Sequence, residues 1–133
     1  MSKPKKIQFQ VSTQHIDTPN VVKVIVYDSA KDFSKYNEVG GYAIGLTNKK
    51  SRSYTNTRYL DYHKHIITIR LVKGKCPPEV VCHEIAHAAC YLFTIERFSL
   101  SVDDIDSEER FCYIMGDLFA KVNRKLHDYK VWS

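Results

Sequence analysis

The first half of the chain has the hydrophobic spacing of β-strands. Apolar and polar residues alternate over 7–11, and β-branched residues dominate 21–27, which predicts a central strand there. A further strand is predicted within 59–72. It is clearest at 65–72, where Ile67 and Ile69 share one face and polar residues occupy the other. These patterns predict a sheet built from the first half of the chain.

The region between these strands has weaker signals. Asp28 or Ser29 suits the N-cap of a short helix over 30–36, which the glycine at Gly40 would end. The other predictions in this region are a strand at 42–46 and, from its polar composition, a loop or hairpin connection at 47–56.

The second half has helical spacing. Pro78 suits the first turn of a helix that runs to Ile95, and a second helix is predicted from a cap at Asp106 or Ser107 to about His127. The apolar residues of the second helix recur every three or four positions: Phe111, Met115, Leu118, Val122 and Leu126. Strands followed by two long helices predict an α+β fold, with a small, mostly antiparallel sheet packed on both helices.

The chain has 133 residues, which suits a single domain over 1–133. Its 44% of hydrophobic and 26% of charged residues are ordinary for a soluble protein. No apolar run reaches the about eighteen residues of a membrane span. The basic residues 1–6, expected to form a disordered arm, are not followed by the apolar stretch of a secretion signal. We therefore expect a cytoplasmic protein without a membrane partner.

The four cysteines show no disulfide or zinc-ribbon spacing. They are Cys76, Cys82, Cys90 and Cys112. None forms a C-x-x-C pair, and two lie in the predicted helix at 78–95, so we expect buried, reduced thiols.

The net charge is +5, and the pI is about 9.0. Such a balance would suit a nucleic-acid partner. However, the lysines are scattered and the chain has no motif for binding nucleic acid, so a solvated basic surface is the preferred interpretation.

One motif carries candidate chemistry. His83-Glu84-x-x-His87 has the H-E-x-x-H spacing, and it lies inside the apolar run that predicts the first long helix. Residues four apart lie one turn apart on the same helix face, so the two imidazoles can reach one zinc ion. The glutamate can then hold and activate a water molecule.

A catalytic zinc normally takes three protein ligands. A third histidine in the metzincin position is excluded, because Cys90 and Phe93 stand where that class needs Gly and His. The one histidine after His87 in the sequence is His127, which lies forty residues further on and is an unfavourable candidate. The remaining candidates are carboxylates: Glu96, Asp103, Asp104, Asp106, Glu108 and Glu109.

Helical spacing favours Glu109 over Glu108, although it leaves both open. The face that follows Glu109 contains Cys112, Gly116 and Ala120, whose small side chains would let the first long helix approach closely. The face that follows Glu108 is bulkier. An ordinary acidic residue that stabilises the helix N-terminus is the alternative for either position.

The two predicted helices resemble a known family. His83-Glu84-Ile85-Ala86-His87-Ala88, followed by Glu108-Glu109-Arg110-Phe111-Cys112-Tyr113, is similar to small zincin-like metallopeptidases of phages and mobile elements, which have a gluzincin-type arrangement. The resemblance covers roughly residues 21–126. It implies a minimal zincin-like fold with Glu109 as the third zinc ligand. The sequence departs from the family pattern at Cys112, where alanine is usual.

The resemblance implies a zinc-dependent metallopeptidase of the host cytoplasm that cleaves peptide or protein substrates. Glu84 would activate the zinc-bound water, and the strand at 65–72 could pair with an extended substrate. Tyr113, Tyr62 and His63 are candidate donors to the developing oxyanion. His63-x-His65, with Asp61 nearby, is a weaker alternative metal pair. Two other functions stay open: a catalytically silent binding or inhibitor module, and a protease that acts on nucleic-acid-associated proteins.

Overall fold

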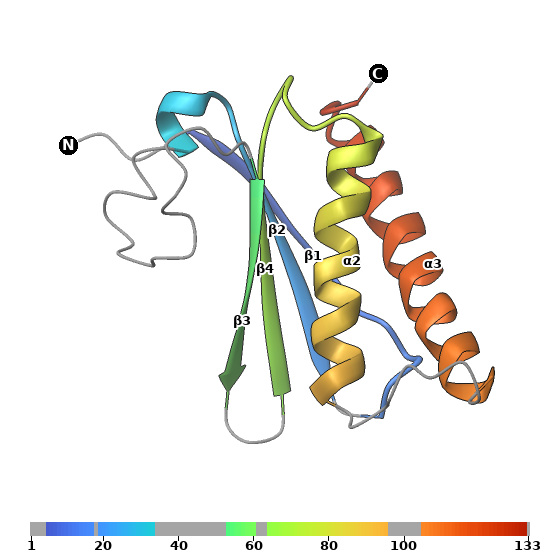
Figure 1. The fold of residues 1–133 in the computed structure, drawn as a ribbon. Coiled ribbons are helices and arrows are strands. Elements are labelled where there is room, and N and C mark those ends of the chain that lie inside the picture. The colour runs from blue at the N-terminus through green and yellow to red at the C-terminus, as the bar shows by residue number, and fades with distance from the viewer. Residues whose placement is uncertain (1–4, 18, 34–52, 61–63, 96–104, 133) are drawn as a thin grey trace.

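The computed structural model describes residues 5–17, 19–33, 53–60, 64–95 and 105–132. Its elements in chain order are β1 (Lys6–Val11), β2 (Asn20–Tyr27), β3 (Ser53–Leu60), β4 (Lys64–Val72), α2 (Pro78–Ile95) and α3 (Ile105–Asp128), as Figure 1 shows. The α+β class and the two long helices are confirmed.

The strands form one sheet in the order β1-β2-β4-β3. The β1/β2 and β3/β4 pairs are antiparallel, and the central β2/β4 pair is parallel. The sheet is therefore mostly antiparallel, as predicted. Because β4 pairs on both sides, the prediction that this strand could accept a substrate is wrong, and the outer strands of the described sheet are β1 and β3.

The strands predicted at 7–11, 21–27 and 65–72 are confirmed, and β2 is indeed central. The loop predicted at 47–56 is wrong from Ser53 onward, because β3 begins there. This outer strand has no alternating apolar residues and is held by main-chain pairing to β4. The strand predicted at 42–46 lies outside the described residues.

The predicted cap before the short helix is confirmed at Ser29. Its hydroxyl accepts a hydrogen bond from the Asp32 amide at 3.2 Å, and its carbonyl accepts one from the Phe33 amide at 3.1 Å. A helical turn is described over 30–33, and the rest of the predicted helix lies outside the described residues.

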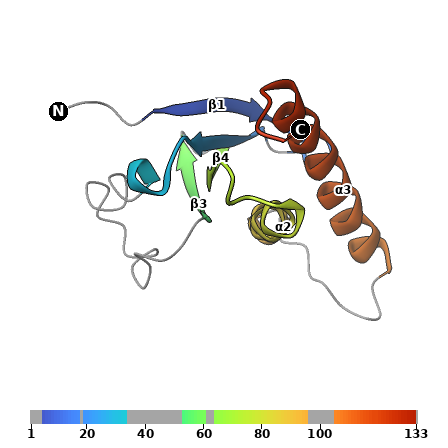
Figure 2. The same cartoon turned by 90° about the horizontal axis from the view of Figure 1, so that it is seen from above.

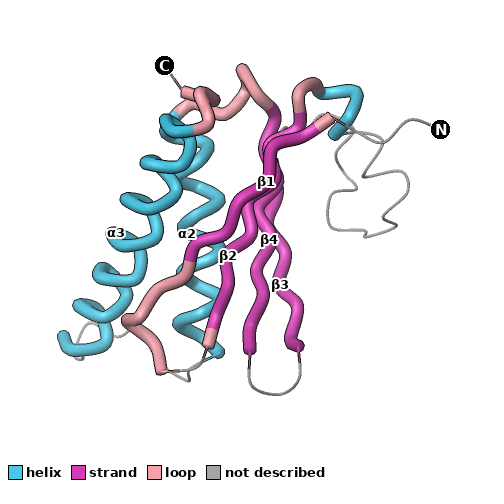
Figure 3. Tube along the Cα trace, turned by 180° about the vertical axis from the view of Figure 1, so that it is seen from behind, coloured by secondary structure: helices cyan, strands magenta, loops and turns pink. Residues whose placement is uncertain are grey.

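Both long helices cover the same face of the sheet and run antiparallel to each other (Figures 1 and 2). Seen from behind, in Figure 3, the strands lie in front of the helices. The main core fills the space between these layers. Its largest contributions come from alternate positions of β2 and β4 and from one face of each helix: Val22, Val24, Val26, Ile67, Ile69, Leu71, Ile85, Leu92, Ile114, Leu118, Val122 and Leu126.

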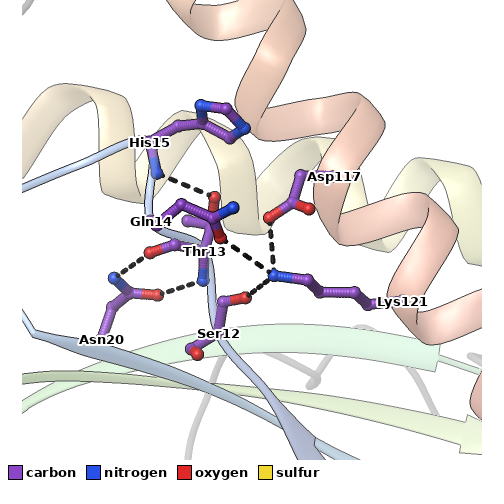
Figure 4. A network of polar contacts seen from close by, with 7 residues as sticks. All are labelled: Ser12, Thr13, Gln14, His15, Asn20, Asp117 and Lys121. Carbon is purple, nitrogen blue, oxygen red and sulfur yellow. Dashed lines mark hydrogen bonds and ion pairs between the residues drawn. The ribbon is translucent and has the colours of Figure 1, made fainter.

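The connection between β1 and β2 is tied to α3 (Figure 4). The Lys121 ammonium donates to the Ser12 carbonyl at 2.7 Å, to Gln14 Oε1 at 3.2 Å and to the Asp117 carboxylate at 2.9 Å. This arrangement holds one edge of the sheet against the helix layer.

Three predicted boundaries need correction. Helix α3 begins at Ile105, so Asp106 and Ser107 lie in its first turn and do not cap it. Lys6 begins β1, and the Lys5 carbonyl accepts a hydrogen bond from the Asp28 amide at 3.0 Å, so neither belongs to a disordered arm. Within the described ranges, neither α2 nor α3 is long and apolar enough to cross a membrane.

Candidate metal centre

Helix α2 begins and ends where the sequence predicts, at Pro78 and Ile95. Its sheet-facing side is built from Val81, Ile85, Ala88, Ala89 and Leu92, all essentially inaccessible to solvent. The opposite side is exposed at Cys82, His83, His87 and Cys90. The motif helix is therefore amphipathic and not buried all round.

This exposure corrects the prediction for the cysteines. Cys76 is buried, but Cys82, Cys90 and Cys112 are exposed. The thiols are free, as predicted. Cys90 follows His87 by three positions and so shares its face of α2, a spacing that the sequence already shows.

The two motif histidines converge on one point. The Nε2 atoms of His83 and His87 lie 3.1 Å apart, and their rings are nearly perpendicular, at 82°. At this separation the two nitrogens either share a hydrogen bond or face a common metal ion. Because each Zn–N bond is about 2.0–2.1 Å, two nitrogens of a tetrahedral zinc lie about 3.3 Å apart. The pair therefore fits two ligands of one zinc ion.

Glu84 has a different environment from the histidines beside it. It is only 4% exposed and lies where the exposed face of α2 turns toward the core. Burying a carboxyl group costs free energy unless it is paired, so this position is unusual for an ordinary surface glutamate. The structure thus brings together a buried carboxyl group and two exposed imidazoles within one turn of helix.

Glu109 is not close to the histidines in the described structure. Phe93 of α2 contacts Phe111 of α3 edge to face, with ring centroids 5.5 Å apart. These two residues therefore lie at the same level along the two helices. His87 precedes Phe93 by six residues and so lies about 9 Å from this level, on the side away from Glu109. Residues two apart on a helix also point about 200° apart, so Glu109 is turned away from α2, and it is exposed.

The small side chains that follow Glu109 do not face α2, so the prediction that they let α2 approach closely is wrong. Cys112, Gly116 and Ala120 are exposed, and a Cβ built on Gly116 would meet nothing within 4 Å. The larger residues Phe111, Met115 and Phe119 pack against the core instead. The helices lie closest near the C-terminus and diverge toward the start of α3, as Figures 1 and 2 both show.

Of the other predicted site residues, Tyr113, Asp106 and Glu108 are described, and all three are exposed. Tyr113 is 58% exposed and stacks on His15, with centroids 5.5 Å apart, on the side of α3 away from Phe93. The remaining candidates, or their side chains, lie outside the described residues: Asp61, Tyr62, His63, His65, Glu96, Asp103 and Asp104. Among the side chains described, no three of His, Cys, Asp and Glu are grouped so as to hold a metal ion.

Comparisons of the chain with protein-family models, with curated proteins and with solved structures found no match. The site therefore rests on its own geometry and on the motif.

Proposed function

We propose that this protein is a zinc-dependent metallopeptidase with a minimal zincin-like fold. His83 and His87 are the two helix ligands, Glu84 is the general base, and Glu109 is the third ligand. The observation that carries the proposal is the 3.1 Å separation of the two Nε2 atoms, which suits a shared metal ion. The role of Glu109 as the third ligand is supported by the family resemblance alone.

Peptide hydrolysis would depend on the zinc ion and on Glu84 of α2. In such sites zinc acts as a Lewis acid toward the scissile carbonyl and makes water more acidic. Glu84 would take the proton of the attacking water and later deliver it to the leaving amine. A structural zinc site needs no such base, and so the glutamate next to His83 favours hydrolysis over a silent binding module.

Strand β3 is the better candidate for holding an extended substrate. It is the outer strand beside β4, and α2 lies against it, as Figure 2 shows. An extended peptide could add to its outer edge through main-chain hydrogen bonds. A peptide bound in this way would lie next to the helix that carries the motif.

Metal analysis tests the proposal. Protein purified without a histidine tag should contain one zinc per chain, and His83→Ala should contain none. His127→Ala removes another exposed histidine and should keep the metal. Glu84→Gln should keep zinc but lose about 10²–10⁴-fold in peptide hydrolysis, the usual effect of removing a general base. Zinc-free wild-type protein after equilibration with zinc and dialysis would overturn the proposal.

A further inference from the structure

A hollow of about 740 Å³ lies where the start of α2 meets the end of α3. It is lined from three parts of the chain: residues after β4, the last turns of α3, and the C-terminal segment. His83 and His87 do not line it, so it is distinct from the candidate metal centre. Its volume falls within the about 300–1,000 Å³ of small-molecule sites.

Ring side chains form much of its wall, three of them aromatic (Phe119, His127 and Trp132) and two of them proline (Pro77 and Pro78). The Trp132 indole is fixed in place, because its Nε1 donates a hydrogen bond to the Cys76 carbonyl at 2.8 Å. The His127 ring meets the indole edge to face, with centroids 5.6 Å apart. Rings held in this way offer apolar faces on which another ring can stack.

The hollow suits an uncharged ligand. None of the described residues that line it carries a permanent charge, although the chain has a net charge of +5. Cys76 is 3% exposed, and burial raises the pKa of its thiol, which disfavours the charged form. The start of α2 offers little to an anion, because Pro77 and Pro78 have no N–H and the Val80 amide already bonds to the Pro77 carbonyl at 3.0 Å.

Polar contacts in the hollow are few. The side chain of Asn123 is half-buried on α3 and carries both a donor and an acceptor. We propose that the hollow binds a small, uncharged aromatic molecule that packs against the Trp132 indole and bonds to the Asn123 amide through a polar substituent. This site is independent of the proposed peptidase.

The chain provides its own reporter, since Trp132 is its only tryptophan. N-phenyl-1-naphthylamine, an uncharged aromatic probe, should quench the Trp132 emission saturably with one probe per chain. The anionic probe 8-anilino-1-naphthalenesulfonate has the same rings with a sulfonate added. It should bind at least about tenfold more weakly, because its charge would be buried without a partner.

A matched pair of variants locates the probe. Asn123→Phe places a ring inside the hollow and should reduce the affinity for the uncharged probe at least about tenfold, which corresponds to about 1.4 kcal/mol. Ala120→Phe adds a ring on the exposed face of the same helix and should leave the affinity unchanged. Circular dichroism confirms that both variants fold. Absence of quenching, equal affinity for both probes, or an equal effect of both substitutions would overturn the proposal.

Discussion

The side-chain amide of Asn20 bonds to both backbone groups of Thr13. Its Oδ1 accepts from the Thr13 amide at 3.0 Å, and its Nδ2 donates to the Thr13 carbonyl at 2.9 Å (Figure 4). Both residues are buried. One side chain therefore takes the place of a strand partner where β1 has ended and β2 begins.

Replacing Asn20 should destabilise the fold. Asn20→Ala leaves two buried backbone groups without this partner, at about 1–3 kcal/mol for each unpaired group. We expect the free energy of unfolding in urea to fall by about 2–6 kcal/mol in total. Gln14→Ala, in the same connection but exposed, should change it by less than about 0.5 kcal/mol. Equal effects of the two substitutions would show that this amide has no special role.

The third zinc ligand can be tested on α3. Glu109→Gln removes a charged oxygen ligand, and we expect the zinc affinity to fall by at least about tenfold. Glu108→Gln has the same change in charge at the neighbouring position and should not affect it. Binding through Glu109 requires the first turns of α3 both to move toward α2 and to rotate about the helix axis, because Glu109 is turned away from α2. Metal binding can drive such a change because it is coupled to folding. Unchanged affinity in both variants, measured by competition with a chelator, would place the ligand elsewhere.

Just beyond the end of α3 lies a position, Lys130, where glycine should increase stability. Lys130 has a φ of 59°, its amide bonds to the His127 carbonyl at 3.0 Å, and the Val131 amide bonds to the Leu126 carbonyl at 2.8 Å. This is a Schellman motif, whose left-handed position favours glycine. Lys130→Gly should therefore stabilise the protein by about 0.5–1 kcal/mol in urea unfolding. Lys125→Gly, within the helix, should destabilise it by about 1 kcal/mol, and a loss of stability in both variants would contradict this account.

The buried thiol of Cys76 should make stability depend on alkaline pH. Burial raises its pKa above the ordinary value, and the contact with Trp132 lowers it only in part. Above about pH 8.5 the unfolded chain loses this proton while the folded chain keeps it, so stability falls as pH rises. The slope from one such group reaches at most about 1.4 kcal/mol per pH unit.

Cys76→Ala removes the pH dependence that comes from the buried thiol. The free energy of unfolding of this variant should therefore fall less steeply than that of the wild type between pH 8 and pH 10. Cys112→Ser changes an exposed thiol and should keep the wild-type slope. Parallel curves for the wild type and Cys76→Ala would show that the thiol is not linked to folding.

Helix α2 and strand β4 were predictable because the end signals and the hydrophobic pattern of each indicate the same element. Pro78 fits the first turn of α2, the apolar run ends at Ile95, and alternate apolar residues specify β4. Strand β3 could not be predicted in full, because an outer strand held by main-chain pairing does not need an apolar pattern. The start of α3 was missed by one or two residues for a similar reason, since several polar residues there could cap a helix.

The candidate site was predictable in part. The spacing of His83 and His87 determines that they share a face, and the structure agrees. The sequence could not show which side of α2 is buried, because the run around the motif is apolar on most sides. The relation between α2 and α3 depends on contacts such as Phe93 with Phe111, which join residues far apart in the chain.

The parallel pairing of β2 with β4 has a consequence for how the chain folds. Among the described strands, the sheet consists of two antiparallel pairs, β1/β2 and β3/β4, which join where β2 meets β4. Each pair contains mostly local contacts, whereas the joint brings together distant segments, and such contacts form slowly. We therefore expect the two halves of the sheet to form early and their joining to limit the refolding rate. Val24→Ala, at the joint, should slow refolding in stopped-flow measurements, and an unchanged rate would place the slow step elsewhere.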